Sequence, residues 1–289
     1  MSATDPRSAH TRIFGRTHLA VPTIGQGTWQ MDKDDRASCV AALRAGLDLG
    51  LTHVDTAEIY GNGRVEELVA DAIDGRRDEV FLVSKVKPTN AGRFGTMEAC
   101  ERSLKRLRTD RLDCYLLHWR ESVPLTETIE AFEALEKSGK IRSWGVSNFD
   151  VVDLEEAQSI AGPGRIACNQ VYYHPGDRSI EHAVLPWCER NGVALVGFSP
   201  FASTGGFPKA ESVGGKALAA VAARYGASAR QVVLAYVSRK PSLLAIPKTS
   251  RAEHVRDNAG AMSLLLDADD LAAIERAFPL GAPGALPTG

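Results

Sequence analysis

The sequence predicts an α/β protein, a closed (β/α)8 TIM barrel with a short N-terminal hairpin and an extra C-terminal helix. Eight short apolar stretches alternate with segments of helical spacing, and strands separated by helices pair in parallel. The length of 289 residues suits a barrel of ~250 residues. The chain has no G-x-G-x-x-G turn, which an open doubly wound sheet would use to bind a dinucleotide.

We expect one domain over residues 1–289, because no linker, low-complexity run or short repeat divides the chain. The polar segment from Met1 to Thr11 is predicted to be a loose terminus. The next segment, Arg12 to Gly25, is predicted to form a hairpin with a turn at Gly15.

Apolar periodicity and Gly, Ser, Thr or Asp punctuation define the repeating elements. The predicted strands cover residues 24–28, 51–55, 80–86, 112–118, 141–146, 166–171, 193–198 and 243–246. The predicted helices cover residues 36–49, 65–73, 96–107, 126–138, 150–160, 179–190, 216–224, 229–239, 251–258 and 267–278. Thr96 is the expected cap of the third helix.

Composition excludes several classes of partner. A net charge of −2 and a pI of about 6.4 give no reason to expect nucleic acid or an anionic membrane. We see no signal peptide, and no apolar run approaches the ~18 residues of a membrane span. We therefore expect a cytoplasmic protein and take a monomer as the working prediction, although composition does not determine the oligomeric state.

Cysteine and histidine spacing gives no sign of a disulfide or a metal site. The cysteines, expected to be buried and reduced, are Cys39, Cys100, Cys114, Cys168 and Cys188. The histidines without metal-ligand spacing to carboxylates or cysteines are His10, His18, His53 and His182. No metal is expected.

Polar side chains occur at every predicted strand end, where a barrel of this kind carries its chemistry. They are Thr28 and Trp29, Asp55, Lys85, His118, Ser147 and Asn148, Gln170, Ser199, and Lys248. We expect them to converge on one mouth. An Asp, a Lys and a His at three consecutive strand ends are more than stability requires, and they indicate a catalytic site.

Tyr60 follows the second of these strands and is a candidate proton donor. A phenol is a poor acid at its ordinary pKa of ~10. A lysine ammonium about 4 Å away would favour the tyrosinate by ~4 kcal/mol at an effective dielectric near 20, or roughly three pKa units. Lys85 could supply this charge, Asp55 could hold Lys85, and His118 could donate a hydrogen bond to a carbonyl oxygen. This set suits hydride addition to an aldehyde or ketone, and the reverse oxidation of an alcohol.

Seven short motifs follow one another along the chain. They are GQGTW at 25–29, DTAEIY at 55–60, SK at 84–85, DCYLLHW at 113–119, GVSNF at 145–149, NQVYYHP at 169–175 and IPKT at 246–249. In this order and spacing the chain resembles the aldo-keto reductases, nicotinamide-dependent enzymes on a (β/α)8 barrel. The resemblance extends from about Arg12 to Phe278 and implies the same fold and chemistry here.

The resemblance implies a role for each matching residue. Tyr60 would be the general acid, tuned by Lys85 and Asp55, with His118 orienting the carbonyl. The expected contacts with the nicotinamide are Thr28, Trp29, Ser147, Asn148 and Gln170, with Phe198 stacked on its ring. Along the pyrophosphate the expected contacts are Ser199, Pro200 and Phe201. At the adenosine 2′-phosphate they are Lys248, Thr249, Ser250, Arg251 and His254, and at the adenine Asn258. The expected substrate contacts are Trp29, Tyr60, His118 and Trp119.

Four positions depart from the family pattern, and one of them is Phe198, which stands where members usually stack a tyrosine on the nicotinamide. His254 stands where NADPH-preferring members usually have arginine, and Asp257 where they have glutamate. Lys248 and Arg251 still offer positive charge for a 2′-phosphate, so NADPH is expected over NADH, with NADH possible. Arg120 replaces the usual proline and could add a cation near the pocket mouth.

Three functions remain open at this stage. The leading hypothesis is an NADPH-dependent carbonyl reductase. A nicotinamide-binding sensor or accessory subunit with little turnover is the second, and a barrel isomerase acting on sugar phosphates is the third. For the first, the short segments 119–125 and 279–289 predict an open pocket with broad aldehyde tolerance and modest affinity.

Overall fold

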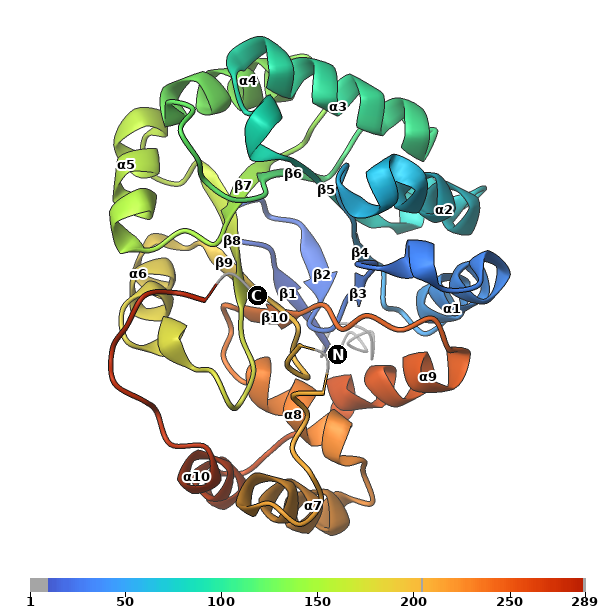
Figure 1. The fold of residues 1–289 in the computed structure, drawn as a ribbon, viewed down its shortest axis with the longest axis vertical. Helices are drawn as coiled ribbons and strands as arrows, with labels where there is room; N and C mark the ends of the chain where they lie inside the picture. Colours follow the sequence, from blue (N-terminus) through green and yellow to red (C-terminus); the bar gives the residue numbers. More distant parts are fainter. Residues whose placement is uncertain (1–9, 204, 288–289) are drawn as a thin grey trace, which may run out of the picture.

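The computed structural model describes residues 10–203 and 205–287 and confirms the predicted (β/α)8 barrel (Figure 1). Eight parallel strands pair in chain order, and bridges from Ile24 to Ala245 and from Gly27 to Lys248 join the first strand to the last. The barrel strands are β3 (Gln26–Gly27), β4 (His53–Asp55), β5 (Phe81–Val86), β6 (Cys114–Leu117), β7 (Trp144–Ser147), β8 (Ile166–Tyr172), β9 (Ala194–Phe198) and β10 (Leu243–Ala245).

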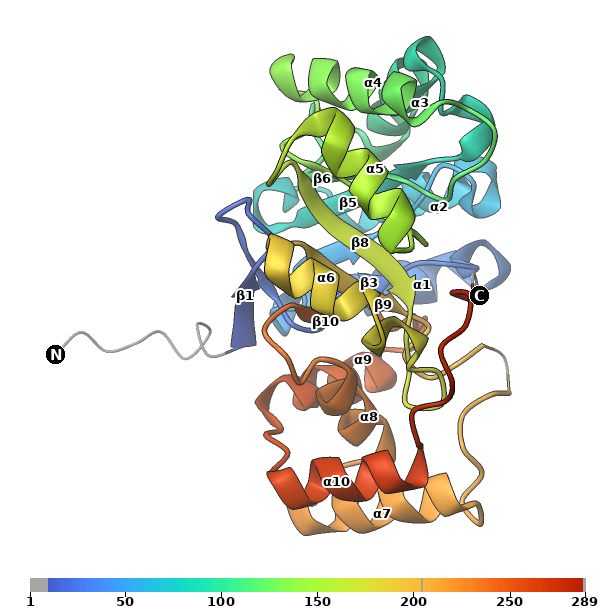
Figure 2. The ribbon, with the colours of Figure 1, turned by 90° about the vertical axis from the view of Figure 1, so that its left-hand side faces the viewer.

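The predicted hairpin is also present, and it lies at one end of the barrel (Figure 2). Strands β1 (Thr11–Ile13) and β2 (Ala20–Pro22) pair antiparallel, and the turn at Gly15 uses a φ of 56°, which glycine adopts readily. Thr11, predicted to be in the loose terminus, belongs to β1. His10 is also described, and its carbonyl oxygen accepts a hydrogen bond from the Thr23 amide, while residues 1–9 of that prediction lie outside the described residues.

Helices surround the barrel (Figure 1). They are α1 (Arg36–Asp48), α2 (Arg64–Ile73), α3 (Arg93–Leu107), α4 (Leu125–Lys137), α5 (Val151–Ala161), α6 (Val184–Asn191), α7 (Val213–Tyr225), α8 (Ala229–Val237), α9 (Ala252–Gly260) and α10 (Ala268–Ala277). The last is the predicted extra helix, and it packs against α7 outside the ring. No helix among the described residues is long and apolar enough to cross a membrane.

Two helix predictions were wrong. Thr96 does not cap α3, which begins three residues earlier after Gly92; the Thr96 side chain is buried and donates to the carbonyl oxygen of Asn90. The helix predicted over 179–190 is a 3₁₀ turn followed by α6, because the chain leaves helical geometry at Ala183. The turn directs Glu181 inward, where its carboxylate binds Arg178 and Arg239.

The strand periodicity places the site. Residues two apart on a strand share a face, and the side chains inside the barrel form an apolar layer beside the hairpin. This layer contains Phe14, Val21, Phe81, Val83, Cys114, Leu116, Ala167, Cys168, Ala194, Val196, Leu244 and Ile246. The next inward positions carry Lys85 on β5, and His118, Phe198 and Lys248 at or just beyond the ends of β6, β9 and β10. The same alternation that fills the barrel therefore brings polar groups to its other end.

Candidate active site

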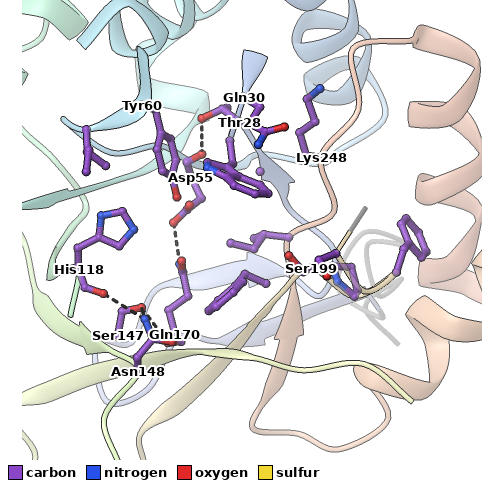
Figure 3. A pocket seen from close by; sticks show the side chains of 18 of the residues that line it. Thr28, Gln30, Asp55, Tyr60, His118, Ser147, Asn148, Gln170, Ser199 and Lys248 are labelled. Carbon is purple, nitrogen blue, oxygen red and sulfur yellow. Dashed lines mark hydrogen bonds between the residues drawn. The ribbon is translucent and has the colours of Figure 1, made fainter. Parts of the chain in front are cut away.

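A cavity of about 640 Å³ opens at the carboxyl ends of the barrel strands (Figure 3). Most of the predicted site residues line it. They are Thr28, Trp29, Asp55, Tyr60, His118, Trp119, Ser147, Asn148, Gln170, Phe198, Ser199, Pro200, Phe201 and Lys248. The remaining predicted catalytic residue, Lys85, is fully buried behind Asp55 and Tyr60.

Sequence reasoning missed several residues of the cavity wall. They are Gly27, Gln30, Asp32, Lys33, Ile59, Gly61, Ala202, Ser203 and Ile246. Each lies close to a predicted residue: Gly27 ends β3, Ile246 follows β10, and the others lie on the segments after β3, β4 and β9. Gly27, Ile59 and Ile246 belong to motifs that carry the family resemblance, so those motifs could have indicated them. The others could have been indicated only by their positions near a strand end.

The ammonium of Lys85 joins the predicted catalytic groups. Its Nζ donates to Asp55 Oδ1 at 2.5 Å and to the carbonyl oxygen of Thr56 at 2.8 Å, and it lies 3.3 Å from Tyr60 Oη. Asp55 accepts a further hydrogen bond from Gln170 Nε2 at 2.7 Å. The buried charge of Lys85 is thus paired, and the third hydrogen-bonding direction of its ammonium is toward the phenol of Tyr60.

The pKa of Tyr60 differs from the value that sequence reasoning predicted. Burial raises the pKa of Tyr60 above its ordinary value, and the opposing effect of Lys85 only reduces that rise. Burial also lowers the pKa of Lys85, but Asp55 and Tyr60 outweigh this, so the Lys85 pKa is raised. Lys85 is therefore charged and Tyr60 carries its proton at neutral pH.

His118 lies beside the phenol. Its ring is 5.7 Å from the ring of Tyr60 in an edge-on arrangement. Burial, with the Lys85 charge added, lowers the pKa of His118 to about 2, so the imidazole is neutral. A neutral imidazole and a protonated phenol can both donate a hydrogen bond to one carbonyl oxygen.

Ser147, Asn148 and Gln170 form the opposite wall (Figure 3). The Ser147 hydroxyl donates to the Gln170 carbonyl oxygen at 2.9 Å, and Asn148 Nδ2 lies 3.3 Å from the His118 carbonyl oxygen. Asn148 holds a φ of 62°, an uncommon conformation that turns its side chain into this network. Its Oδ1 is buried and has no hydrogen-bond partner among the described residues, and it lies on a residue that lines the cavity. This is an acceptor that a bound amide could satisfy.

The predicted phosphate cluster lies away from the catalytic groups, around the first turn of α9. Lys248 reaches the cavity wall, while Thr249, Ser250 and Arg251 lead into the helix. The N-cap position, Arg251, gives no side-chain hydrogen bond to the first turn of α9. His254 is exposed on the same helix.

Two further predicted residues are found in other surroundings. Asn258 is 4% exposed and faces a small pocket with Gln26 and Pro247, apart from the main cavity. Arg120 does not add a free cation at the mouth, because its guanidinium binds Asp153 at 2.7 Å and Glu156 at 2.7 Å. Its charge is therefore compensated.

The fold and this constellation define an oxidoreductase of the aldo/keto reductase family, whose model matches residues 23–278; the chain belongs to that family. Among its relatives, methylglyoxal reductase YeaE of Escherichia coli K12 is 45% identical over 267 residues, which are 90% of this chain and 92% of that protein. An aldo/keto reductase from Klebsiella pneumoniae, crystallised with NADP and acetate, is 45% identical and has a TM-score of 0.90 over 96% of this chain and 99% of that one. A Klebsiella pneumoniae structure with NADPH is 45% identical and has a TM-score of 0.89, covering 96% and 98% of the two chains.

Proposed function

We propose that this chain reduces small aldehydes and ketones with NADPH, and that 2-oxoaldehydes such as methylglyoxal are its substrate class. The observation that carries the proposal is the hydrogen-bonded series from Asp55 through Lys85 to Tyr60, which ends beside His118 in a cavity. The relatedness to a methylglyoxal reductase supports the substrate class.

The proposed mechanism has a hydride donor, NADPH, and a proton donor, Tyr60. Bound NADPH supplies the hydride that adds to the carbonyl carbon. Tyr60 gives its proton to the carbonyl oxygen, and the charged Lys85 stabilises the phenolate left behind. His118, kept neutral by burial, orients the carbonyl by donating a hydrogen bond to its oxygen. Asp55 positions Lys85 and compensates its charge.

The residues present fit a nicotinamide dinucleotide. The unpartnered Oδ1 of Asn148 suits the amide hydrogens of a carboxamide, with Ser147 and Gln170 beside it and Thr28 and Trp29 across the cavity. Phe198 offers a ring face to the nicotinamide, as sequence analysis predicts.

The outer half of the site would hold the rest of the cofactor. Ser199, Pro200 and Phe201 form the cavity wall that leads away from Phe198, where a pyrophosphate would lie. Lys248, Thr249, Ser250 and Arg251 at the start of α9 suit a 2′-phosphate, because cations, hydroxyls and free helix N–H groups all bind phosphate. His254 and Asn258 remain candidates for the adenosine end. The cluster favours NADPH over NADH, and equal kcat/KM values for the two would contradict this.

The shape of the cavity supports broad carbonyl tolerance. Trp29, half exposed, and Trp119 stand on its wall. Of the described residues, none after Lys248 contributes to the wall. We therefore expect modest affinity for many short or aromatic aldehydes, and high selectivity for one large substrate would be inconsistent with this.

Tyr60→Phe tests the proposal. The variant keeps the ring and loses the proton, so the rate of NADPH oxidation with methylglyoxal should fall by a factor of about 100 or more. The dissociation constant for NADPH should stay within about twofold, since substitutions outside a contact have small effects. Tyr225→Phe, on α7, is the matched control and should retain wild-type activity.

The same experiment separates the reductase from the sensor hypothesis. A wild-type protein that binds NADPH tightly but turns over no carbonyl would favour a sensor or accessory subunit. Turnover that survives Tyr60→Phe would remove Tyr60 from the role of general acid while leaving the reaction class in place.

A further inference from the structure

One carboxylate of the protein is already in contact with the predicted phosphate cluster at the start of α9, which consists of Lys248, Thr249, Ser250 and Arg251. Asp34, on the segment between β3 and α1, forms an ion pair with Lys248, although the two are 214 positions apart in the chain. The hydrogen bond from Lys248 lowers the pKa of Asp34, and Ser250 and the nearby charge of Arg251 act in the same direction. The cluster is therefore suited to an anion, and a side chain of the protein itself is in contact with it.

We infer that Asp34 is a specificity-determining residue. Its carboxylate competes with the 2′-phosphate of NADPH for Lys248 and so weakens the preference for NADPH over NADH. The inference rests on the proposed function, because it requires the 2′-phosphate to bind at Lys248 and Ser250. Both partners are only partly exposed, with 30% of the Lys248 and 35% of the Asp34 side chain accessible, so the pair stands at the edge of the cavity rather than in free solvent.

The competition follows from charge. A 2′-phosphate carries about −1.5 to −2 charge near neutral pH. To reach Lys248 it must displace the Asp34 carboxylate or remain close to it, and either course costs free energy. The corresponding ribose of NADH has a neutral hydroxyl, which meets no such repulsion. Asp34 therefore acts against NADPH selectively.

A neighbouring carboxylate offers a matched control. Asp35 is the next residue and caps α1, where its side chain accepts a hydrogen bond from the Ser38 amide. Asparagine caps helices about as well as aspartate, so Asp35→Asn removes the same charge and keeps the cap. Within the described residues, Lys248 forms its ion pair with Asp34 and none with Asp35.

The experiment measures dissociation constants of NADP⁺ and NAD⁺ by isothermal titration calorimetry at low salt. Asp34→Asn should bind NADP⁺ about three- to tenfold more tightly than wild type, as expected for one partly exposed charge. Its affinity for NAD⁺, and the affinities of Asp35→Asn for both, should change by no more than about twofold. The gain should shrink as sodium chloride is added, because salt screens exposed charges.

A Lys248→Met background completes the test. If Asp34 acts by occupying Lys248, Asp34→Asn should improve NADP⁺ binding less in that background than in wild type. The inference is overturned if Asp34→Asn leaves NADP⁺ binding unchanged, weakens it, or strengthens NAD⁺ binding equally. Wild-type protein that binds neither dinucleotide would refute the proposed function as well, which is a different result from wild-type binding that Asp34→Asn fails to alter.

Discussion

At the scale of single residues, the buried pair of Asp55 and Lys85 is the most sensitive point. Their side chains are 2% and 0% exposed, and their charges compensate one another. Lys85→Met leaves the Asp55 carboxylate buried without its cation, so we expect a loss of about 3–5 kcal/mol in the free energy of unfolding. Urea denaturation followed by circular dichroism would measure it.

The double variant Asp55→Asn/Lys85→Met gives the internal control. It removes both charges, so it should lose less stability than Lys85→Met alone, although each variant abolishes the proposed catalytic pairing. A double variant at least as unstable as the single one would show that packing, rather than an uncompensated charge, dominates at this position.

Residue types were predicted better than residue environments. Asp55, Lys85 and His118 were predicted from their places at strand ends and Tyr60 from its place on the loop after one, and the structure brings the four together. The direction of the shift in the Tyr60 pKa was not predicted, because burial opposes the effect of Lys85 and depends on every element that covers the phenol. A sequence pattern shows which charged groups are present, but it does not show how far folding removes each group from water.

At the scale of elements, β4 links the two ends of the barrel. Asp55, its last residue, reaches the cavity, while His53, its first, is buried against Phe14 and Phe81 beside the hairpin. Neither ring nitrogen of His53 has a hydrogen-bond partner in the described parts of the chain. Burial lowers the pKa of His53 to about 4. The strand therefore contains a group that resists protonation.

This histidine predicts acid sensitivity. Between pH ~6.5 and about 4 the unfolded chain takes up a proton that the folded protein does not, so stability falls as the pH falls through this window. The loss from His53 between pH 7 and pH 5 should be about 2 kcal/mol. In His53→Leu, urea denaturation at the two pH values should differ by about 2 kcal/mol less than in wild type.

His254→Leu, which changes an exposed histidine, should keep the wild-type pH dependence. If His53→Leu and wild-type protein lose the same stability on acidification, the acid sensitivity arises elsewhere.

Element boundaries show what local sequence determines. Asp150 and Asp267 were read as helix starts, and both accept the expected hydrogen bond from the third residue of the helix. Thr96 has the same capping chemistry but is buried within α3. The single helix predicted over 179–190 is interrupted at Ala183, next to a turn whose Glu181 binds Arg239 on a distant segment. Tertiary contacts overrode local preference in both cases.

At the scale of the whole molecule, the barrel order was predictable and the contacts across it were not. Alternation of strands and helices was sufficient for the fold. The hydrogen bond from Gln170 to Asp55 joins residues 115 apart, and the Asp34–Lys248 pair joins residues 214 apart. Nothing in either local pattern indicates such a partner. A monomeric state and a cytoplasmic location stay predictions.

Transfer of hydride from the cofactor to a carbonyl carbon can be followed with an isotope label. The protein would be incubated with methylglyoxal and NADPH carrying deuterium at both C4 positions of the nicotinamide, and the product analysed by mass spectrometry. Each alcohol molecule formed by the wild-type protein should carry one carbon-bound deuterium, and Tyr60→Phe should form about 100-fold less of this labelled alcohol in the same time. Methylglyoxal recovered unchanged, or converted to a product without deuterium, would rule out hydride transfer to this substrate.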